Sequence, residues 1–205
     1  MTCQLKKIYI AFSLLLVTPA YSYATTADTN FYAQALQAES KGNHELAISH
    51  YLVSAKKGVS DAKLALARIY QNTYGNDQEH IKWLLEAAQE GNVLAQYELG
   101  MTYQKGSAAV TSNLQEAQKW LTLAANDGKY GLAAYELFKI SSNNNEIDQA
   151  KTWLLNAAEK GIYEAMEQLQ EAYQLGESGF TINTEKSLYW QQQVLNSQEK
   201  NTDEE

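Results

Sequence analysis

Proline, cysteine and arginine are almost missing from this 205-residue chain, and each scarcity narrows the kind of protein it can be. Proline occurs once, at Pro19, which argues against a loop-rich all-β fold. Cys3 is the only cysteine, so no disulfide can form within the chain. Arg68 is the only arginine, and 24 acidic side chains outnumber 16 basic ones. Because the chain lacks the basic surface that follows nucleic-acid phosphates, we expect no nucleic-acid partner.

The remaining composition is that of an ordinary folded protein. Apolar residues make up 45% of the chain and charged residues 20%. This balance is too apolar for a disordered chain and too poor in proline for a collagen-like one. The length suits one large domain or two small ones.

The first 24 residues have the order of a secretory signal peptide. Lys6 and Lys7 precede a mostly apolar run at residues 8–17, and a small-x-small pattern follows at residues 22–24. We therefore predict cleavage near Ala24. The alternative, a transmembrane anchor, is disfavoured because an apolar run of ten residues is shorter than the roughly 20 needed to span a bilayer.

Cleavage would determine both the location and the charge of the mature chain. Cys3 lies before the apolar run, where it cannot be the lipid-bearing cysteine of a bacterial lipoprotein, so the mature chain would be unlipidated and free of thiols. Loss of Lys6 and Lys7 takes the net charge from −8 to −10. We expect a periplasmic or secreted protein with no membrane span after cleavage.

Most of the remaining chain is repetitive, with the motif Trp-Leu-x-x-Ala-Ala-x-x-Gly. Three full copies start at Trp83, Trp120 and Trp153. An earlier, less regular copy ends at Gly58, and a later one starts at Trp190 without the glycine. Successive motif glycines are 33, 37 and 33 residues apart. A fixed period of this size is typical of solenoid proteins.

Each repeat is predicted to be a helical hairpin. A second block follows each glycine, starting at Ala62, Ala95, Ala133 and Ala165. Apolar residues recur at intervals of three and four in both blocks, as in helices. Asparagines seven residues before the His50, Trp83, Trp120 and Trp190 positions suit N-caps: Asn43, Asn76, Asn113 and Asn183. The motif glycines suit the left-handed position that ends a helix.

The predicted core includes a broad apolar band on the second helix of each hairpin. In the central repeat the band comprises Ala117, Trp120, Leu121, Ala124 and Ala125. A band this wide needs cover from its own hairpin and from the next one, as in a stacked α-solenoid. We divide residues 31–197 into five repeats: 31–58, 59–91, 92–128, 129–161 and 162–197. A short extension, 25–30, would precede them, and an acidic disordered tail, 198–205, would follow.

Together the two blocks read Ala-x-x-x-Leu-(Gly)-x-x-Tyr and Ala-x-x-Trp-(Leu)-x-x-Ala-Ala-x-x-Gly. This pattern strongly resembles the Sel-one-like repeat (SLR) family, relatives of the tetratricopeptide repeats, and is clearest at residues 95–128. The resemblance covers about 31–197. It implies an all-α, right-handed superhelix of about five hairpins in an exported bacterial protein. Phe138 and Gln170 replace the glycine of the Leu-Gly pair, which puts close helix approach in question there.

The residue types that carry chemistry are mostly explained by the scaffold. The tryptophans repeat with the fold, so we assign them to the core rather than to a sugar-stacking ladder. His44, His50 and His80 have no i, i+4 histidine partner, so we expect no metal site. Paired carboxylates could in principle catalyse glycoside hydrolysis, but the acids vary between copies: Glu86 corresponds to Leu123 and Asn156. We therefore expect no enzyme and no cofactor.

The concave face of the solenoid, lined by the first helices, is the candidate site for a protein partner. Positions two before and two after the repeat leucine would point into it: Leu64, Arg68, Tyr97, Met101, Tyr135, Lys139, Glu167 and Glu171. Tyr97 and Tyr135 could equally cover a neighbouring helix. We expect the charge to change along this face, from Arg68 and Lys139 to Glu167 and Glu171.

The resemblance implies a non-enzymatic adaptor that organises protein complexes in the cell envelope. It also leaves open an immunity protein, since some exported relatives neutralise secreted antibacterial enzymes, including phospholipases, by covering them. A neighbouring toxin gene would discriminate between the two. The identity of the partner does not follow from the sequence.

Overall fold

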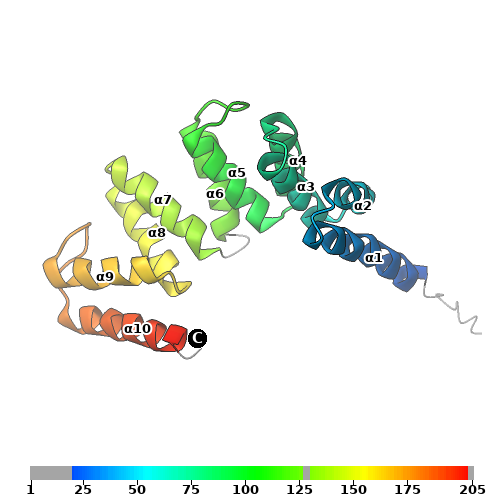
Figure 1. The fold of residues 1–205 in the computed structure, drawn as a ribbon. Helices are drawn as coiled ribbons and strands as arrows, with labels where there is room; N and C mark the ends of the chain where they lie inside the picture. The colour runs from blue at the N-terminus through cyan, green and yellow to red at the C-terminus, as the bar shows by residue number, and fades with distance from the viewer. Residues whose placement is uncertain (1–19, 127–129, 203–205) are drawn as a thin grey trace, which may run out of the picture.

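A computed structural model describes residues 20–126 and 130–202 of the chain, and all regular elements in that part are helices (Figure 1). The ten helices are α1 (Ala20–Ser40), α2 (His44–Lys56), α3 (Ser60–Asn72), α4 (Asp77–Gln89), α5 (Val93–Lys105), α6 (Leu114–Asn126), α7 (Gly131–Asn143), α8 (Ile147–Glu159), α9 (Tyr163–Leu175) and α10 (Thr184–Thr202). None of them is long and apolar enough to cross a bilayer.

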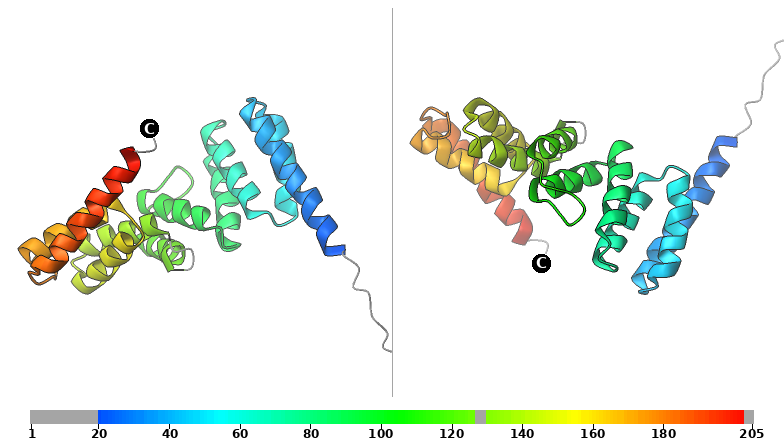
Figure 2. Two further views of the ribbon diagram at one scale, coloured as in Figure 1. Left: turned by 90° about the horizontal axis from the view of Figure 1, so that it is seen from below. Right: turned by 90° about the horizontal axis from the view of Figure 1, so that it is seen from above.

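The helices pack in chain order as five hairpins, α1/α2 to α9/α10, and each hairpin packs on the next. Two further views show the same elongated array, with α1 and α10 at opposite ends (Figure 2). Three clusters of buried residues replace a single central core, as expected where each repeat contacts only its neighbours. The predicted all-α solenoid is confirmed.

Asparagine side chains begin the second helices, as predicted from their spacing. Asn43 Oδ1 accepts from the backbone N–H of Leu46 at 3.1 Å, and Asn76 Oδ1 accepts from that of Glu79 at 3.1 Å. Asn113 and Asn183 make the same bonds before α6 and α10. In the fourth hairpin Glu146 stands at the cap position and makes no side-chain capping bond.

Glycines in the left-handed region follow the second helices, where a side chain would be strained. Gly58, Gly91 and Gly161 have φ of 85°, 86° and 86°. Gly128, the fourth predicted helix-ending glycine, lies outside the described residues. The helix boundaries thus follow from residues that the repeat places at both ends of each second helix.

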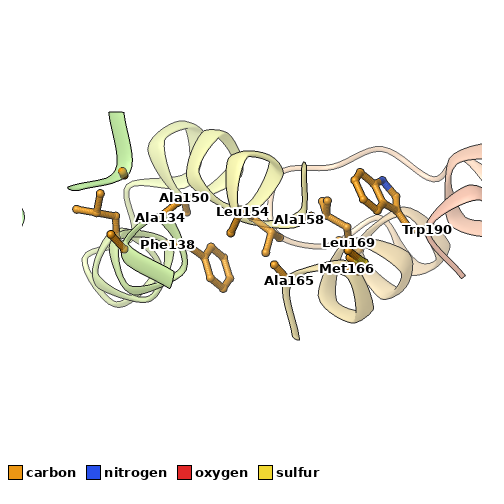
Figure 3. Packing of buried hydrophobic residues seen from close by; sticks show 14 of the residues in the cluster. Ala134, Phe138, Ala150, Leu154, Ala158, Ala165, Met166, Leu169 and Trp190 are labelled. Carbon is orange, nitrogen blue, oxygen red and sulfur yellow. The ribbon is translucent and has the colours of Figure 1, made fainter. Parts of the chain in front are cut away.

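The predicted apolar band of α6 is fully buried, and Trp120 is only 7% exposed. Trp190 is also buried, in the cluster of buried residues between Leu121 and Val194 that we call the C-terminal cluster and that includes Phe138, Leu154 and Leu169 (Figure 3). Trp83 and Trp153 are half-buried and pack against the edges of the clusters. For Trp83 the reason is polar: its indole Nε1 donates to Glu79 Oε2 at 3.0 Å, which holds the ring near the surface.

The ends of the chain differ from the expected boundaries. Residues 1–19, most of the predicted signal peptide, lie outside the described part, so its cleavage remains a prediction. Helix α1 begins at Ala20 and runs without a break through Ala24 and residues 25–30. Helix α10 continues to Thr202, into the predicted disordered tail, because no glycine or proline interrupts it.

Candidate functional site

The eight residues predicted to bind a partner lie on α3, α5, α7 and α9, the first helices of successive hairpins. We call the side of the solenoid formed by these helices and α1 the first-helix face. The repeat leucines Leu66, Leu99, Leu137 and Leu169 are at most 2% exposed. Each residue of a helix is rotated by about 100° relative to the previous one. The positions two before and two after a leucine therefore lie about 40° apart, on the side of the helix opposite to that leucine.

Leu64 does not project from this face. Its side chain is 4% exposed and packs in a cluster with Leu84, Leu99 and Trp120. Leu64 forms part of the floor of a groove, and it does not protrude as a side chain that a partner could enclose. Periodicity within α3 alone could not show this, because residues of later helices provide the cover.

Both cations on the face are already paired with carboxylates. Arg68 Nε donates to Glu98 Oε1 at 3.0 Å, and the guanidinium forms an ion pair with the same carboxylate. Lys139 Nζ lies 2.6 Å from Glu136 Oε1 and 5.3 Å from the centre of the Tyr135 ring. The predicted change from basic to acidic is therefore wrong: Glu98 and Glu136, which the sequence reasoning missed, cancel the basic part.

Tyr97, Met101 and Tyr135 are half-buried and pack against the C-terminal cluster. The Tyr97 ring makes an edge contact with Tyr130, with 5.1 Å between centroids. The Tyr135 ring stacks on Phe138 at 5.8 Å, and its hydroxyl accepts a hydrogen bond from Gln168 Nε2 at 3.1 Å.

Burial raises the pKa of both phenols, and the nearby carboxylates raise it further. After burial, the carboxylate that raises the pKa most is that of Glu136 for Tyr97 and that of Glu164 for Tyr135. Each ring therefore stays neutral at physiological pH, covers a neighbouring helix on one side and is accessible on the other. The two roles that the sequence left open for these tyrosines are compatible.

A groove of about 470 Å³ lies at the N-terminal end of the first-helix face. Its lining is mostly apolar at the floor and polar at the rim: Tyr32, Leu36, Glu39, Ser40, Tyr51, Asp61, Leu64, Ala65, Arg68 and Leu94. Leu36 and Leu94 are 46% and 39% exposed. Sequence reasoning missed both, although Leu94 precedes the motif alanine as the exposed Leu132 does in the next repeat.

A smaller pocket of about 290 Å³, the acidic pocket, lies between α7 and α9. It is lined by Phe138, Ser142, Leu154, Gln168, Glu171, Ala172, Glu177 and Ser178. Of the two predicted glutamates of α9, Glu171 lines this pocket. Glu167 is exposed, and its carboxylate accepts from the Tyr163 hydroxyl at 2.7 Å, so the structure does not bring it into the pocket.

Another groove, of about 640 Å³, lies between the α8–α9 turn and α10. Met166, Tyr189, Trp190 and Gln193 are among its lining residues. All of its lining comes from the last hairpin and the end of α8, so this groove does not extend along the stack.

The histidines have structural surroundings. His80 is 3% exposed, and its Nδ1 lies 2.9 Å from the carbonyl oxygen of Ala67 on the neighbouring helix. His50 lies against the Phe31 ring, with 5.9 Å between centroids. In the described part of the chain, no three His, Cys, Asp or Glu side chains gather as a metal site would require.

Comparison with known proteins agrees with this architecture. The Sel1 repeat model matches residues 76–92, 93–129 and 140–162. No curated protein matches the chain by sequence.

Several solved structures share the fold, and two of them illustrate it. One is c5321, a protective antigen of uropathogenic Escherichia coli strains with an SLR fold (TM-score 0.67, 23% identity, 85% of this chain and 39% of that one). The other is a Sel1 repeat protein from Oxalobacter formigenes (TM-score 0.70, 21% identity, 86% of this chain and 77% of that one). The chain thus spans less than half the length of c5321.

Sel1-repeat proteins are in general non-catalytic scaffolds for protein interactions. The matched residues cover α4, the hairpin α5/α6, and the end of α7 with α8, and they include the three full copies of the Trp-to-Gly motif. The matched repeats show that the chain contains three Sel1 repeats, and the helical stack and the two similar structures show an all-α solenoid fold.

Proposed function

We propose that this chain is a non-enzymatic protein-binding scaffold of the bacterial cell envelope and that it holds its partner on the first-helix face. The observation that carries the proposal is the arrangement of Tyr97, Met101 and Tyr135, held half-exposed between a groove at one end and the acidic pocket at the other. The envelope location rests on the signal-peptide pattern of residues 1–24.

The tyrosines suit partner binding because their positions are already restricted. Edge contact with Tyr130 orients Tyr97, and the hydrogen bond from Gln168 orients Tyr135. A side chain that is ordered before binding loses little conformational entropy on binding. Tyrosine is also enriched among the residues that dominate interface energies.

A test is capture of envelope proteins by the purified mature chain, quantified by mass spectrometry. Tyr97→Ala with Tyr135→Ala should weaken capture of the dominant partner by roughly tenfold or more. Both rings also pack on the core, so all variants are compared below their melting temperatures. Leu36→Ser with Leu94→Ser alters exposed side chains of the N-terminal groove and should weaken capture without unfolding the chain.

The matched control is Tyr74→Ala with Tyr189→Ala, two tyrosines that are 50% and 56% exposed and lie outside this face. The control should capture the partner as the unmodified chain does. If both face variants still captured the partner and the Tyr74/Tyr189 control did not, the binding surface would lie elsewhere on the solenoid.

A further inference from the structure

The geometry points to a basic polypeptide segment as the occupant of the first-helix face, with one lysine or arginine side chain of the partner inserted into the acidic pocket between α7 and α9. This inference rests on the proposed function, which it extends by naming the chemistry of the partner. The lining of the pocket and the charge of the face around it both favour a cationic side chain.

The pocket has an apolar floor that suits the aliphatic part of a long cationic side chain. Phe138, Leu154 and Ala172 form this floor, and all three are buried. Phe138 and Leu154 come from the adjacent helices α7 and α8 and lie close together in the C-terminal cluster (Figure 3). Lysine and arginine bury their methylene groups on such surfaces while the charged end stays at the rim.

The rim offers hydrogen-bond acceptors and no cation. Glu171 and Glu177 line the pocket, and within the described residues neither carboxylate forms an ion pair. Gln168 also lines the pocket, and its Nε2 donates to the Tyr135 hydroxyl. A lysine ammonium or an arginine guanidinium carries only donors and would satisfy these acceptors.

Charge along the face favours a segment with several basic residues. Arg68 and Lys139 are each neutralised by a carboxylate of the same face. Glu164, Glu167 and Glu171 follow one another along α9 at intervals of three and four, and all are exposed. A partner with an acidic segment would bring like charges together, which opposes binding, whereas a basic segment is attracted.

The test uses two synthetic peptides with the same apolar residues at helical spacing, one with lysine and arginine at the polar positions and one with glutamate there. Each carries fluorescein, and binding to the complete mature chain is measured by fluorescence anisotropy. The basic peptide should bind and the acidic one should not. Glu171→Gln with Glu177→Gln should weaken binding of the basic peptide by roughly tenfold or more.

The control is Glu45→Gln with Glu185→Gln, which makes the same change in net charge in the first turns of the second helices α2 and α10. It should weaken binding less than twofold. Equal loss in both variant pairs would show that only net charge matters and would overturn the pocket assignment. Failure of the basic peptide to bind, or its displacement by equimolar spermidine, would also overturn the inference.

Envelope capture separates this inference from the proposed function. Loss of capture in the Tyr97/Tyr135 variant together with full capture in the Glu171/Glu177 variant would leave the binding face in place and reject the basic-segment assignment. Loss in neither variant would reject both.

Discussion

Gly100 of α5 lies directly against Leu121 of α6: a Cβ atom at position 100 would be 2.7 Å from Leu121 Cγ and 3.2 Å from its backbone nitrogen. The two helices thus approach too closely for any side chain at this position. In the next hairpin Phe138 takes the glycine position, and its ring is buried against Tyr135 and lines the acidic pocket. The glycine is therefore not needed to form a hairpin, and its replacement accompanies a pocket on the first-helix face.

Gly100→Ala should lower the free energy of unfolding by about 1–2 kcal/mol. Overpacking against Leu121 costs about 1–3 kcal/mol, and the better helix propensity of alanine returns up to about 1 kcal/mol. Urea denaturation followed by circular dichroism measures the change. On a Leu121→Ala background the contact with Leu121 Cγ disappears and only the 3.2 Å approach to the backbone nitrogen stays, so Gly100→Ala should cost clearly less. An equal cost on both backgrounds would contradict the close contact.

Trp120→Ala should cost about 3–5 kcal/mol of stability, the usual range for removing a core aromatic. Trp120→Phe should cost less than half as much, because the buried indole N–H has no hydrogen-bond partner to lose. Trp153, which is half-buried, is the matched comparison, and Trp153→Ala should cost about 2 kcal/mol. If Trp120→Ala changed the unfolding free energy by less than about 1 kcal/mol, the residue would lie on the surface.

The protein should lose stability above about pH 10. Burial and the hydrogen bond from the Tyr51 hydroxyl to Glu39, 2.6 Å long, raise the pKa of that phenol above its ordinary value of 10.0. Burial alone would lower the pKa of Lys63, but its bonds to Glu90 and Glu86 outweigh this and raise it. A raised pKa means that the folded state keeps its proton longer, so the stability from these groups is complete below the unfolded pKa and is lost as pH rises through the folded one.

Tyr51→Phe tests this assignment by thermal melting between about pH 8 and 11. At neutral pH the variant should be about 1 kcal/mol less stable, because Glu39 loses a donor. Its melting temperature should then fall less steeply above pH 10 than that of the unmodified chain. Tyr74→Phe, at an exposed position, serves as the control and should change neither quantity. Parallel melting curves for all three proteins would show that Tyr51 is not responsible.

The mature protein should begin near Thr25 and occur in the envelope fraction of the cell. The reason is the order of Lys6 and Lys7, the apolar run at residues 8–17 and the small residues before Thr25. Mass spectrometry of the N-terminal peptide from fractionated cells measures the start site. A full-length chain that keeps Met1 and stays in the cytosol would contradict export.

Features that depend on neighbours along the chain could be predicted from the amino-acid sequence. Asn76 caps α4 because its side chain meets N–H groups only three residues ahead, and Gly91 ends that helix because its own backbone needs positive φ. The apolar band around Trp120 follows from the 3.6-residue period of the helix. These local rules were sufficient for the hairpins, for most of the boundaries between them and for the buried repeat leucines, but not for the outer ends of α1 and α10.

The exposure and the partners of the side chains on the first-helix face depend on the tertiary structure. Arg68 meets Glu98 from 30 residues away, and Tyr135 meets Gln168 from 33 residues away. Such pairs depend on how far each hairpin is rotated and shifted relative to the next. That rotation is set by side chains packing between repeats, so residues at equivalent positions of the repeat have different partners. For this reason Leu64 is buried at the floor of the N-terminal groove, and the acidic pocket lies beside Phe138. The periodicity of a single helix could predict neither feature.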